Sequence, residues 1–302
     1  MDIKAEIGSR HHAEISVGEE MTSRKECNMN SHDMDVKMGQ RFEFGKNWQA
    51  FLSILNDERI SIAENSLREM LDVKDLNNKS FLDVGSGSGL FSLAARKLGA
   101  TVTSLDFDPA SVACTCELRT RYFPNDSAWS IHEGSVLNNG FLRSLGRYDI
   151  VYSWGVLHHT GRMWDALENV AHLVKQDGVL FLAIYNDEGL KSKCWWKVKK
   201  WYCSGVMGKA IVLSIFIPYF FSRVLLASVL RKENLFAIHT KKRGMSVVRD
   251  WFDWLGGFPF EVARADEIFN FYRNRGFVLR NLKTTSGIGN NQFVFVKTTG
   301  GD

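Results

Sequence analysis

A glycine-rich turn between a short apolar strand and a helix constrains this chain more than any other feature. The strand covers residues 81–84, and glycines follow at alternate positions, Gly85, Gly87 and Gly89. Glycine is needed where a loop bends sharply and a ligand approaches bare backbone. A dinucleotide-binding turn has the spacing Gly-x-Gly-x-x-Gly, which would require glycine at Leu90. The turn is therefore expected to receive a nucleoside joined to an amino acid, not a pyrophosphate.

Asp83 precedes the first glycine, and the combined pattern resembles motif I of the Rossmann-like methyltransferases that use S-adenosylmethionine (SAM). The elements that follow have the order found in that family. A second strand over residues 101–105 ends in Asp106, an acid placed to accept hydrogen bonds from ribose hydroxyls. Asp108 and Pro109 then begin a helix as its N-cap and first residue.

Alternating or continuous apolar runs predict the remaining strands, and apolar residues at helical spacing predict the helices between them. The third to seventh strands are expected over residues 128–132, 148–154, 178–185, 277–282 and 292–296, with helices over 164–174 and 266–274. The fold expected from the resemblance is α/β, with a seven-stranded, mostly parallel, doubly wound sheet whose last strand is antiparallel. An N-terminal helical cap and a helical insertion after the fifth strand complete it.

The chain divides into a polar N-terminal segment and one domain. Residues 1–36 are mixed in charge and lack apolar periodicity, which predicts a disordered or loosely attached segment. Residues 37–302 are expected to form the methyltransferase domain. Apolar side chains at helical spacing predict helices over residues 48–55 and 60–71. The resemblance implies that these helices lie over the cofactor; the alternative is that they cover only the sheet edge.

Composition excludes several classes of protein. A net charge of +4 over 302 residues is too small to indicate a nucleic-acid partner. The five cysteines are odd in number and show no metal-binding spacing, so free thiols and no metal are expected. A basic patch followed by an apolar run, as in a secretory signal, is lacking, and we expect a cytoplasmic protein.

The insertion over residues 187–262 is long enough to fold and serve a purpose. It interleaves tryptophans with lysines and continues into an uncharged run over residues 210–221. Pro218 and Arg223 make this run a poor transmembrane span. Three alternatives stay open: a helical lid over the substrate site, a peripheral contact of residues 195–230 with the inner face of a membrane, or a hairpin buried against its own domain.

The resemblance implies that SAM is the cofactor and that residues after the strands hold it. Ser135 stands where the family often has an acid, so adenine recognition is expected to use backbone groups and the Ser135 hydroxyl. The expected cofactor contacts are Asp83, Gly85, Ser86, Gly87, Gly89, Asp106, Phe107, Ser135, Val136 and Trp154.

Two histidines follow the fourth strand, where the resemblance to small-molecule methyltransferases, including those of ubiquinone biosynthesis, places a group facing the acceptor. Imidazole suits a general base because its ordinary pKa of about 6.5 lies near neutrality. We predict His158 as the base and His159 as the residue that orients the turn or fixes the cofactor pocket; the alternative is that both are structural. The candidate substrate-pocket residues are Tyr185, Arg243, Asp253 and Trp254.

The expected function is transfer of a methyl group from SAM to a hydroxyl of a small or lipid-linked acceptor, as in bacterial quinone-type and sugar-type O-methyltransferases. Methylation of a small amine is a close alternative, and a non-catalytic SAM-binding or membrane-associated protein is an alternative of another class. An Asn-Pro-Pro-Tyr motif is missing, which disfavours a DNA amino-methyltransferase, and Leu90 disfavours an NAD-dependent oxidoreductase.

Overall fold

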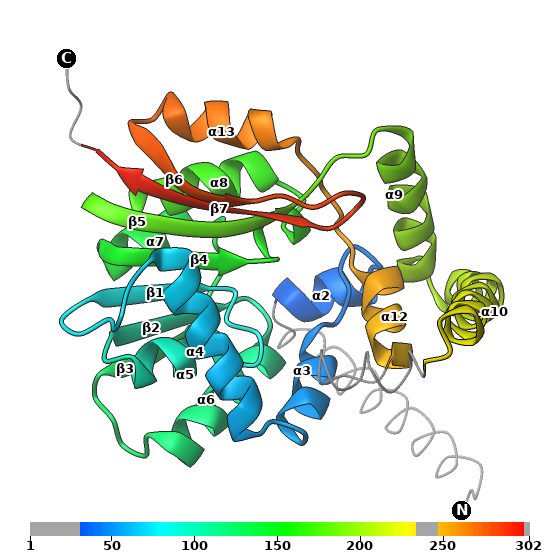
Figure 1. Cartoon of the computed structure of the whole chain (residues 1–302), viewed down its shortest axis with the longest axis horizontal. Coiled ribbons are helices and arrows are strands. Elements are labelled where there is room, and N and C mark those ends of the chain that lie inside the picture. Colours follow the sequence, from blue (N-terminus) through cyan, green and yellow to red (C-terminus); the bar gives the residue numbers. More distant parts are fainter. Residues whose placement is uncertain (1–30, 234–246, 299–302) are drawn as a thin grey trace, which may run out of the picture.

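A computed structural model describes residues 31–233 and 247–298 of the chain, and a seven-stranded sheet lies at its centre (Figure 1). The strands are β1 (Ser80–Val84), β2 (Thr101–Asp106), β3 (Trp129–Glu133), β4 (Tyr148–Trp154), β5 (Val174–Tyr185), β6 (Phe277–Lys283) and β7 (Asn290–Lys297). Their order across the sheet is β3-β2-β1-β4-β5-β7-β6. The pairs from β3 to β5 are parallel, whereas β7 is antiparallel to both β5 and β6. The expected fold, with its antiparallel last strand, is confirmed.

Helices cover both faces of the sheet. One face carries α4 (Asp57–Leu71), α5 (Leu90–Lys97) and α6 (Pro109–Tyr122); the other carries α7 (Asn139–Leu145), α8 (Met163–His172) and α13 (Ala265–Arg273). Because successive side chains of a strand point to opposite faces, β1 supplies both cores. Phe81 is fully buried with the first three helices, and its neighbour Leu82 is fully buried with the other three.

The largest difference from the expected boundaries is at the start of β5. This strand begins at Val174, four positions before the predicted Gly178, and the preceding helix ends at His172. Residues 175–177 are polar, and Asp177 has a positive φ of 58°, so the apolar pattern that predicts a strand begins only after them. An irregularity in the pairing with β4 lies at the same place.

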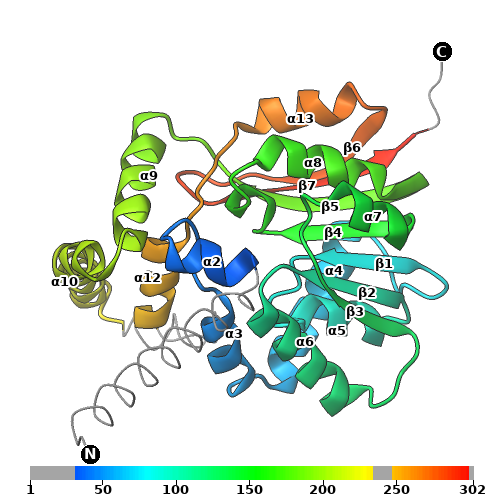
Figure 2. The same cartoon turned by 180° about the vertical axis from the view of Figure 1, so that it is seen from behind.

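Helices from the N-terminal part and from the insertion lie together beyond the end at which β4 finishes (Figures 1 and 2). They are α2 (Ser31–Lys37), α3 (Gly45–Leu52), α9 (Leu190–Cys203), α10 (Val206–Arg231) and α12 (Val247–Gly256). Lys199 of α9 is buried between α9 and α12, where its ammonium donates to the carbonyl of Trp254 and lies 4.0 Å from the centre of that indole ring.

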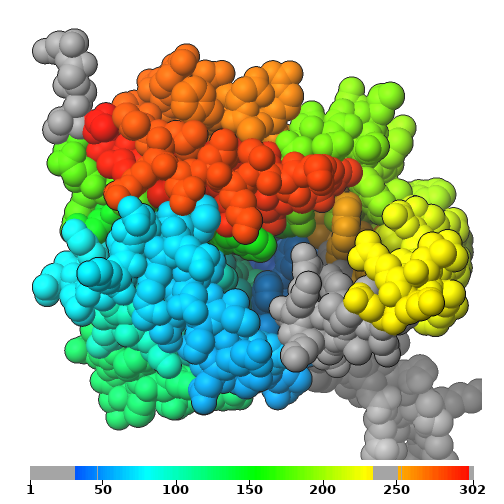
Figure 3. Space-filling view, in the orientation of Figure 1, coloured from blue at the N-terminus to red at the C-terminus, as the bar shows by residue number. Residues whose placement is uncertain are grey.

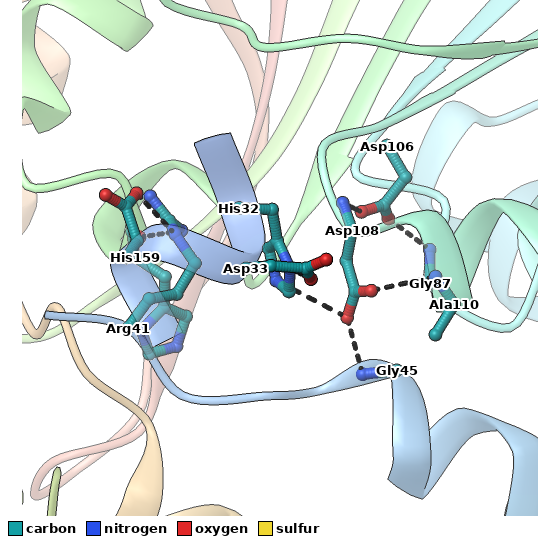
Figure 4. Close-up of polar contacts among 10 residues, drawn as sticks. His32, Asp33, Arg41, Gly45, Gly87, Asp106, Asp108, Ala110 and His159 are labelled. Carbon is teal, nitrogen blue, oxygen red and sulfur yellow. Dashed lines mark hydrogen bonds and ion pairs between the residues drawn. The ribbon is translucent and has the colours of Figure 1, made fainter. Parts of the chain in front are cut away.

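The prediction of a loosely attached N-terminal segment is wrong for residues 31–36. These residues form most of α2, and His32 is only 3% exposed. Asp108 makes the attachment: its carboxylate accepts from the backbone N–H of Ala110 at 2.9 Å and of Gly45 at 2.7 Å (Figure 4). Nε2 of His32 lies 3.7 Å from the same carboxylate. One side chain at the end of β2 therefore caps α6 and holds both α2 and α3.

We predict that Asp108→Ala destabilises the protein by about 3 kcal/mol, because it removes an N-cap and leaves the buried Gly45 N–H without its acceptor. The matched control is Asn56→Ala, which removes only the N-cap of α4, through the bond from Arg59 N–H, and should cost about 1 kcal/mol. Urea unfolding measures both changes, and hydrogen exchange of residues 31–52 should rise only in the Asp108 variant. Equal losses in the two variants would show that Asp108 does not hold the N-terminal helices.

Candidate active site

The glycine turn connects β1 to α5, and its three glycine positions cannot accommodate a larger residue. Gly85, Gly87 and Gly89 all have positive φ, at 81°, 54° and 80°. A Cβ on Gly85 would lie 2.4 Å from the side chain of Val156, and one on Gly87 would lie 3.0 Å from the indole ring of Trp48. Both the backbone conformation and the close approach therefore require glycine here.

Two carboxylates flank this turn, the buried Asp83 and the partly buried Asp106. Asp106 accepts from the backbone N–H groups of Gly87 at 2.8 Å and Asp108 at 2.9 Å (Figure 4). Asp83 accepts from the hydroxyl of Ser92 at 2.6 Å. Burial raises the pKa of Asp106 to about 6; burial and the nearby Asp106 raise the pKa of Asp83 to about 7. Within residues 31–233 and 247–298 neither carboxylate has a lysine or arginine in an ion pair. The site therefore favours a ligand that brings positive charge and hydroxyl donors.

A cavity of about 460 Å³ lies at this edge of the sheet, a size suited to a small molecule. Of the ten predicted cofactor contacts, all but Gly89 line it; Gly89 lies against Thr115 instead. The hydroxyl of Ser135 accepts from the backbone N–H of Leu137 at 3.1 Å, so its own hydrogen is available to a ligand. The lining residues from this set are Asp83, Gly85, Ser86, Gly87, Asp106, Phe107, Ser135, Val136 and Trp154.

Residues of the N-terminal helices line the same cavity and were not predicted as site residues. They include His32 of α2, Trp48 of α3, and Arg41 and Phe44 of the segment between these helices. Arg41 donates to the backbone carbonyl of His159 at 3.0 Å, and its guanidinium lies 5.0 Å from the centre of the Phe107 ring. The apolar periodicity of residues 48–55 was the sequence signal that a helix from the N-terminal part packs over this site. The polar sequence around His32 gave none.

The two histidines, predicted as the base and as an orienting residue, have different surroundings. His158 is fully buried and lies outside the cavity lining, with Nδ1 accepting from the backbone N–H of Tyr185 at 3.3 Å. His159 lines the cavity. Its Nδ1 lies 2.6 Å from the carbonyl oxygen of Pro259, and because a carbonyl can only accept, this nitrogen carries the hydrogen.

Burial lowers the pKa of His159 to about 3 and the pKa of His158 well below its ordinary value, so both rings are neutral near pH 7. In the neutral ring of His159, a hydrogen on Nδ1 leaves Nε2 with a free lone pair. His159, not His158, therefore presents a proton acceptor in the wall of the cavity.

The predicted substrate residues do not gather around the cavity. The ring of Tyr185 lies 4.0 Å from that of His158, and Trp254 lies 4.5 Å from Trp195, and neither belongs to the lining. Arg243 and the side chain of Asp253 lie outside the described part of the chain. In that described part no group of three or more His, Cys, Asp or Glu side chains could hold a metal ion.

The residues of the cavity fit the parts of SAM, the cofactor that the resemblance implies. Asp106 has lone pairs left after its two backbone contacts and can accept from a ribose diol. The unpaired Asp83 suits the positively charged end of the cofactor. The bare backbone of the turn allows the close approach that an adenosyl group joined to an amino acid needs.

The chain is similar to known methyltransferases over its central part. It is 32% identical over 118 residues to a ribosomal protein L11 methyltransferase from Sodalis glossinidius, covering 34% of this chain and 40% of that protein. It is 31% identical over 116 residues to a ubiquinone biosynthesis O-methyltransferase from Escherichia fergusonii, covering 38% and 46%. The chain therefore spans less than half the length of these two relatives. A solved magnesium protoporphyrin IX methyltransferase from Synechocystis, holding S-adenosylhomocysteine, superposes with a TM-score of 0.48 and 14% identity over 90% of this chain and 89% of that one.

A family model described as a methyltransferase domain matches residues 82–180. The match begins in β1 and ends in β5, so it includes the glycine turn, both carboxylates and the histidine pair. Together with the strand order, it confirms the resemblance to the Rossmann-like methyltransferases and the prediction of SAM as the cofactor. Residues 82–180 therefore match a methyltransferase domain, and this part of the chain has the glycine turn and the strand order of the Rossmann-like methyltransferases.

Proposed function

We propose that this protein transfers the methyl group of SAM to a hydroxyl of a small or lipid-linked acceptor, and that His159 takes the hydroxyl proton. The observation that carries the proposal is the lone pair of His159 Nε2 in the wall of the cavity that contains the glycine turn and both carboxylates. When bound, SAM supplies a methyl group on a positively charged sulfur, so the protein has only to bind, orient and deprotonate.

The low pKa of His159 is compatible with this role. The imidazole stays neutral at any pH well above 3, so Nε2 is always available to accept a hydrogen bond. An alcohol or phenol oxygen that is gaining a methyl group becomes a strong acid, and a weak base in the right position can then take its proton. The carbonyl of Pro259 holds the ring through Nδ1 and fixes the direction of Nε2.

The walls of the cavity favour an acceptor with an aromatic or apolar body. The N-terminal part contributes Phe42, Phe44 and Phe51 to the lining. Helix α5 contributes Phe91, and strand β4 contributes Trp154. Trp154 is 41% exposed, so one aromatic ring reaches from the cavity to the surface. The name of the Escherichia relative, an O-methyltransferase, supports an oxygen acceptor, whereas the name of the Sodalis relative points to a protein substrate.

We predict that Gly87→Val abolishes SAM binding, because a branched side chain at a φ of 54° would strain the turn and lie against Trp48. The control is Gly140→Val in α7, where φ is not positive and an added Cβ meets only Asn138 at 3.5 Å. Isothermal calorimetry with SAM should show no heat for the first variant and unchanged affinity for the second. Undiminished affinity in Gly87→Val would show that the turn does not hold the cofactor.

We predict that the affinity for S-adenosylhomocysteine falls as the pH drops below about 7. The pKa values of Asp83 and Asp106 are raised to about 7 and about 6, so both carboxylates are ionised above this range and become neutral as the pH falls through it. Protonation removes acceptors for the ribose and the attraction for the ligand's ammonium group. Titration calorimetry from about pH 8 to about pH 5 measures the effect.

In the same titration, Asp106→Asn should bind weakly and with a shallower pH dependence. Asp126→Asn is the control, since Arg96 lowers the pKa of this remote carboxyl and its loss should leave the profile unchanged. A wild-type affinity that stays constant over the whole range would contradict the assignment of both carboxylates.

We predict that His159→Ala lowers kcat about a hundredfold and leaves the Kd for S-adenosylhomocysteine within about twofold, because the residue acts on the acceptor's proton. The matched control is His172→Ala on the exposed surface of α8, which should change neither quantity. Release of S-adenosylhomocysteine is measured with catechol-type phenols and with the corresponding anilines as acceptors. Turnover of anilines but not of phenols would replace oxygen by nitrogen as the acceptor, and an unchanged kcat in His159→Ala would remove His159 from the reaction.

A further inference from the structure

We propose that α9 and α10 dock this protein on an anionic lipid bilayer, with α10 lying in the plane of the interface. The docking surface consists of the exposed residues of these two helices. On α9 they include Lys193, Trp196, Lys197 and Lys200; on α10 they include Val206, Met207, Ile211, Ile215, Tyr219, Phe221, Leu225, Leu226, Val229 and Leu230.

α10 is apolar on all sides but is covered by protein on one side only. It is long and apolar enough to cross a membrane, with a mean hydropathy of 2.0 over its most apolar window, and only 6% of that window is buried. A helix that is hydrophobic all round is normally buried, and contiguous exposed apolar patches mark interaction sites. The hairpin buried against its own domain, one alternative predicted for this segment, is therefore wrong for α10.

The covered side of α10 faces the rest of the protein. Val212 is buried, and Phe216 and Phe220 lie 5.2 and 6.4 Å from the ring of Trp195 on α9. Phe220 also lies 5.6 Å from Trp251 on α12. The other side points outward: its large apolar residues are between 39% exposed, at Ile211, and 88% exposed, at Val206. In the space-filling view the yellow surface of α10 forms one edge of the molecule (Figure 3).

The charge of this segment favours an anionic surface. Residues 190–232 contain nine lysines and arginines and no aspartate or glutamate, while the net charge of the whole chain is only +4. All of these cations except Lys199 are exposed. On α9, Lys193, Lys197 and Lys200 share one face with Trp196, the mixture of cation and indole that is found at lipid headgroup level. A second copy of the chain is a poor occupant, because pairing this surface with itself would bring like charges together.

The contacts of α10 favour a position in the interface over a position across the bilayer. Phe216 and Phe220 are packed on α9 and α12 along the middle of the helix, so a spanning helix would have to leave its own domain. Pro218 and Arg223 also lie within the helix. The exposed guanidinium of Arg223 donates to the hydroxyl of Tyr219 at 3.0 Å, an arrangement that suits headgroup depth.

Co-sedimentation of the full chain with vesicles tests the proposal. We expect binding to vesicles of phosphatidylglycerol and phosphatidylethanolamine, much weaker binding to phosphatidylcholine alone, and release by high salt or alkaline carbonate. Retention through both salt and carbonate washes would mean that α10 spans the bilayer and would overturn the in-plane position. Equal binding to the two kinds of vesicle would overturn the role of charge, and no binding would overturn the proposal; self-association by sedimentation velocity would then assign the surface to a second copy.

Two pairs of variants separate the docking surface from general effects of charge. Leu226→Glu with Val229→Glu should abolish binding, whereas Val278→Glu with Leu282→Glu, at exposed apolar positions of β6, should preserve it. Replacing Lys193, Lys197 and Lys200 by alanine should weaken binding roughly a hundredfold, at about fivefold for each lysine. The control replaces the exposed Lys74, Lys79 and Lys283 and should leave the affinity unchanged. If the control variants lose as much affinity as the α9 and α10 variants, this surface is not the docking site. The measurement needs no acceptor, so its outcome is independent of the proposed reaction.

Discussion

Two carboxylates next to a glycine turn, one buried and one partly buried, are the constraint on which the rest of the site depends. β1 and β2 are parallel neighbours, with Asp83 opposite Ser104, so their carboxyl ends meet and bring Asp106 close enough for its charge to raise the pKa of Asp83. Burying two such groups is costly without hydrogen bonds. The hydroxyl of Ser92 donates to Asp83, and the backbone N–H of Gly87 donates to Asp106, which fixes the path of the turn. The remaining acceptor capacity faces the cavity and sets the chemistry of the ligand.

The order and type of the central elements were predictable because each carries a strong periodic signal with a clear boundary. β4 was predicted to the residue, since a mainly apolar run, with only Asp149 and Ser153 polar, lies between Arg147 and Gly155. The start of β5 was missed because the first residues of this strand are polar and their pairing with β4 is irregular. An alternating pattern of apolar residues, which predicts strands, is therefore lacking there. α2 was missed for another reason. A helix of seven residues around one buried histidine is held by Asp108, a long-range contact that leaves no local pattern.

The sequence shows where residues lie when backbone topology sets their place, but it does not show the direction of individual side chains. The glycine turn and the acids at strand ends were identified because parallel topology places them at one edge whatever the details of packing. The histidines are adjacent and follow the same strand, so sequence cannot show which one enters the cavity. The short helical turn at Leu157–His159 directs His159 to the cavity and His158 toward β5, and Pro259, distant in sequence, then fixes the tautomer.

The cavity and the helices of the proposed docking surface are connected by packing contacts. Phe42 lines the cavity, and its ring lies 6.1 Å from that of Tyr202 in the same apolar cluster as Val212 of α10. The backbone N–H of Phe42 donates to Phe258, next to the proline that holds His159. A displacement of α10 at a membrane could therefore reach the wall of the cavity and the imidazole of His159 through these contacts of Phe42. This arrangement is suited to an acceptor carried in the bilayer, because the helices that would meet the lipid pack against Phe42, which lines the cavity.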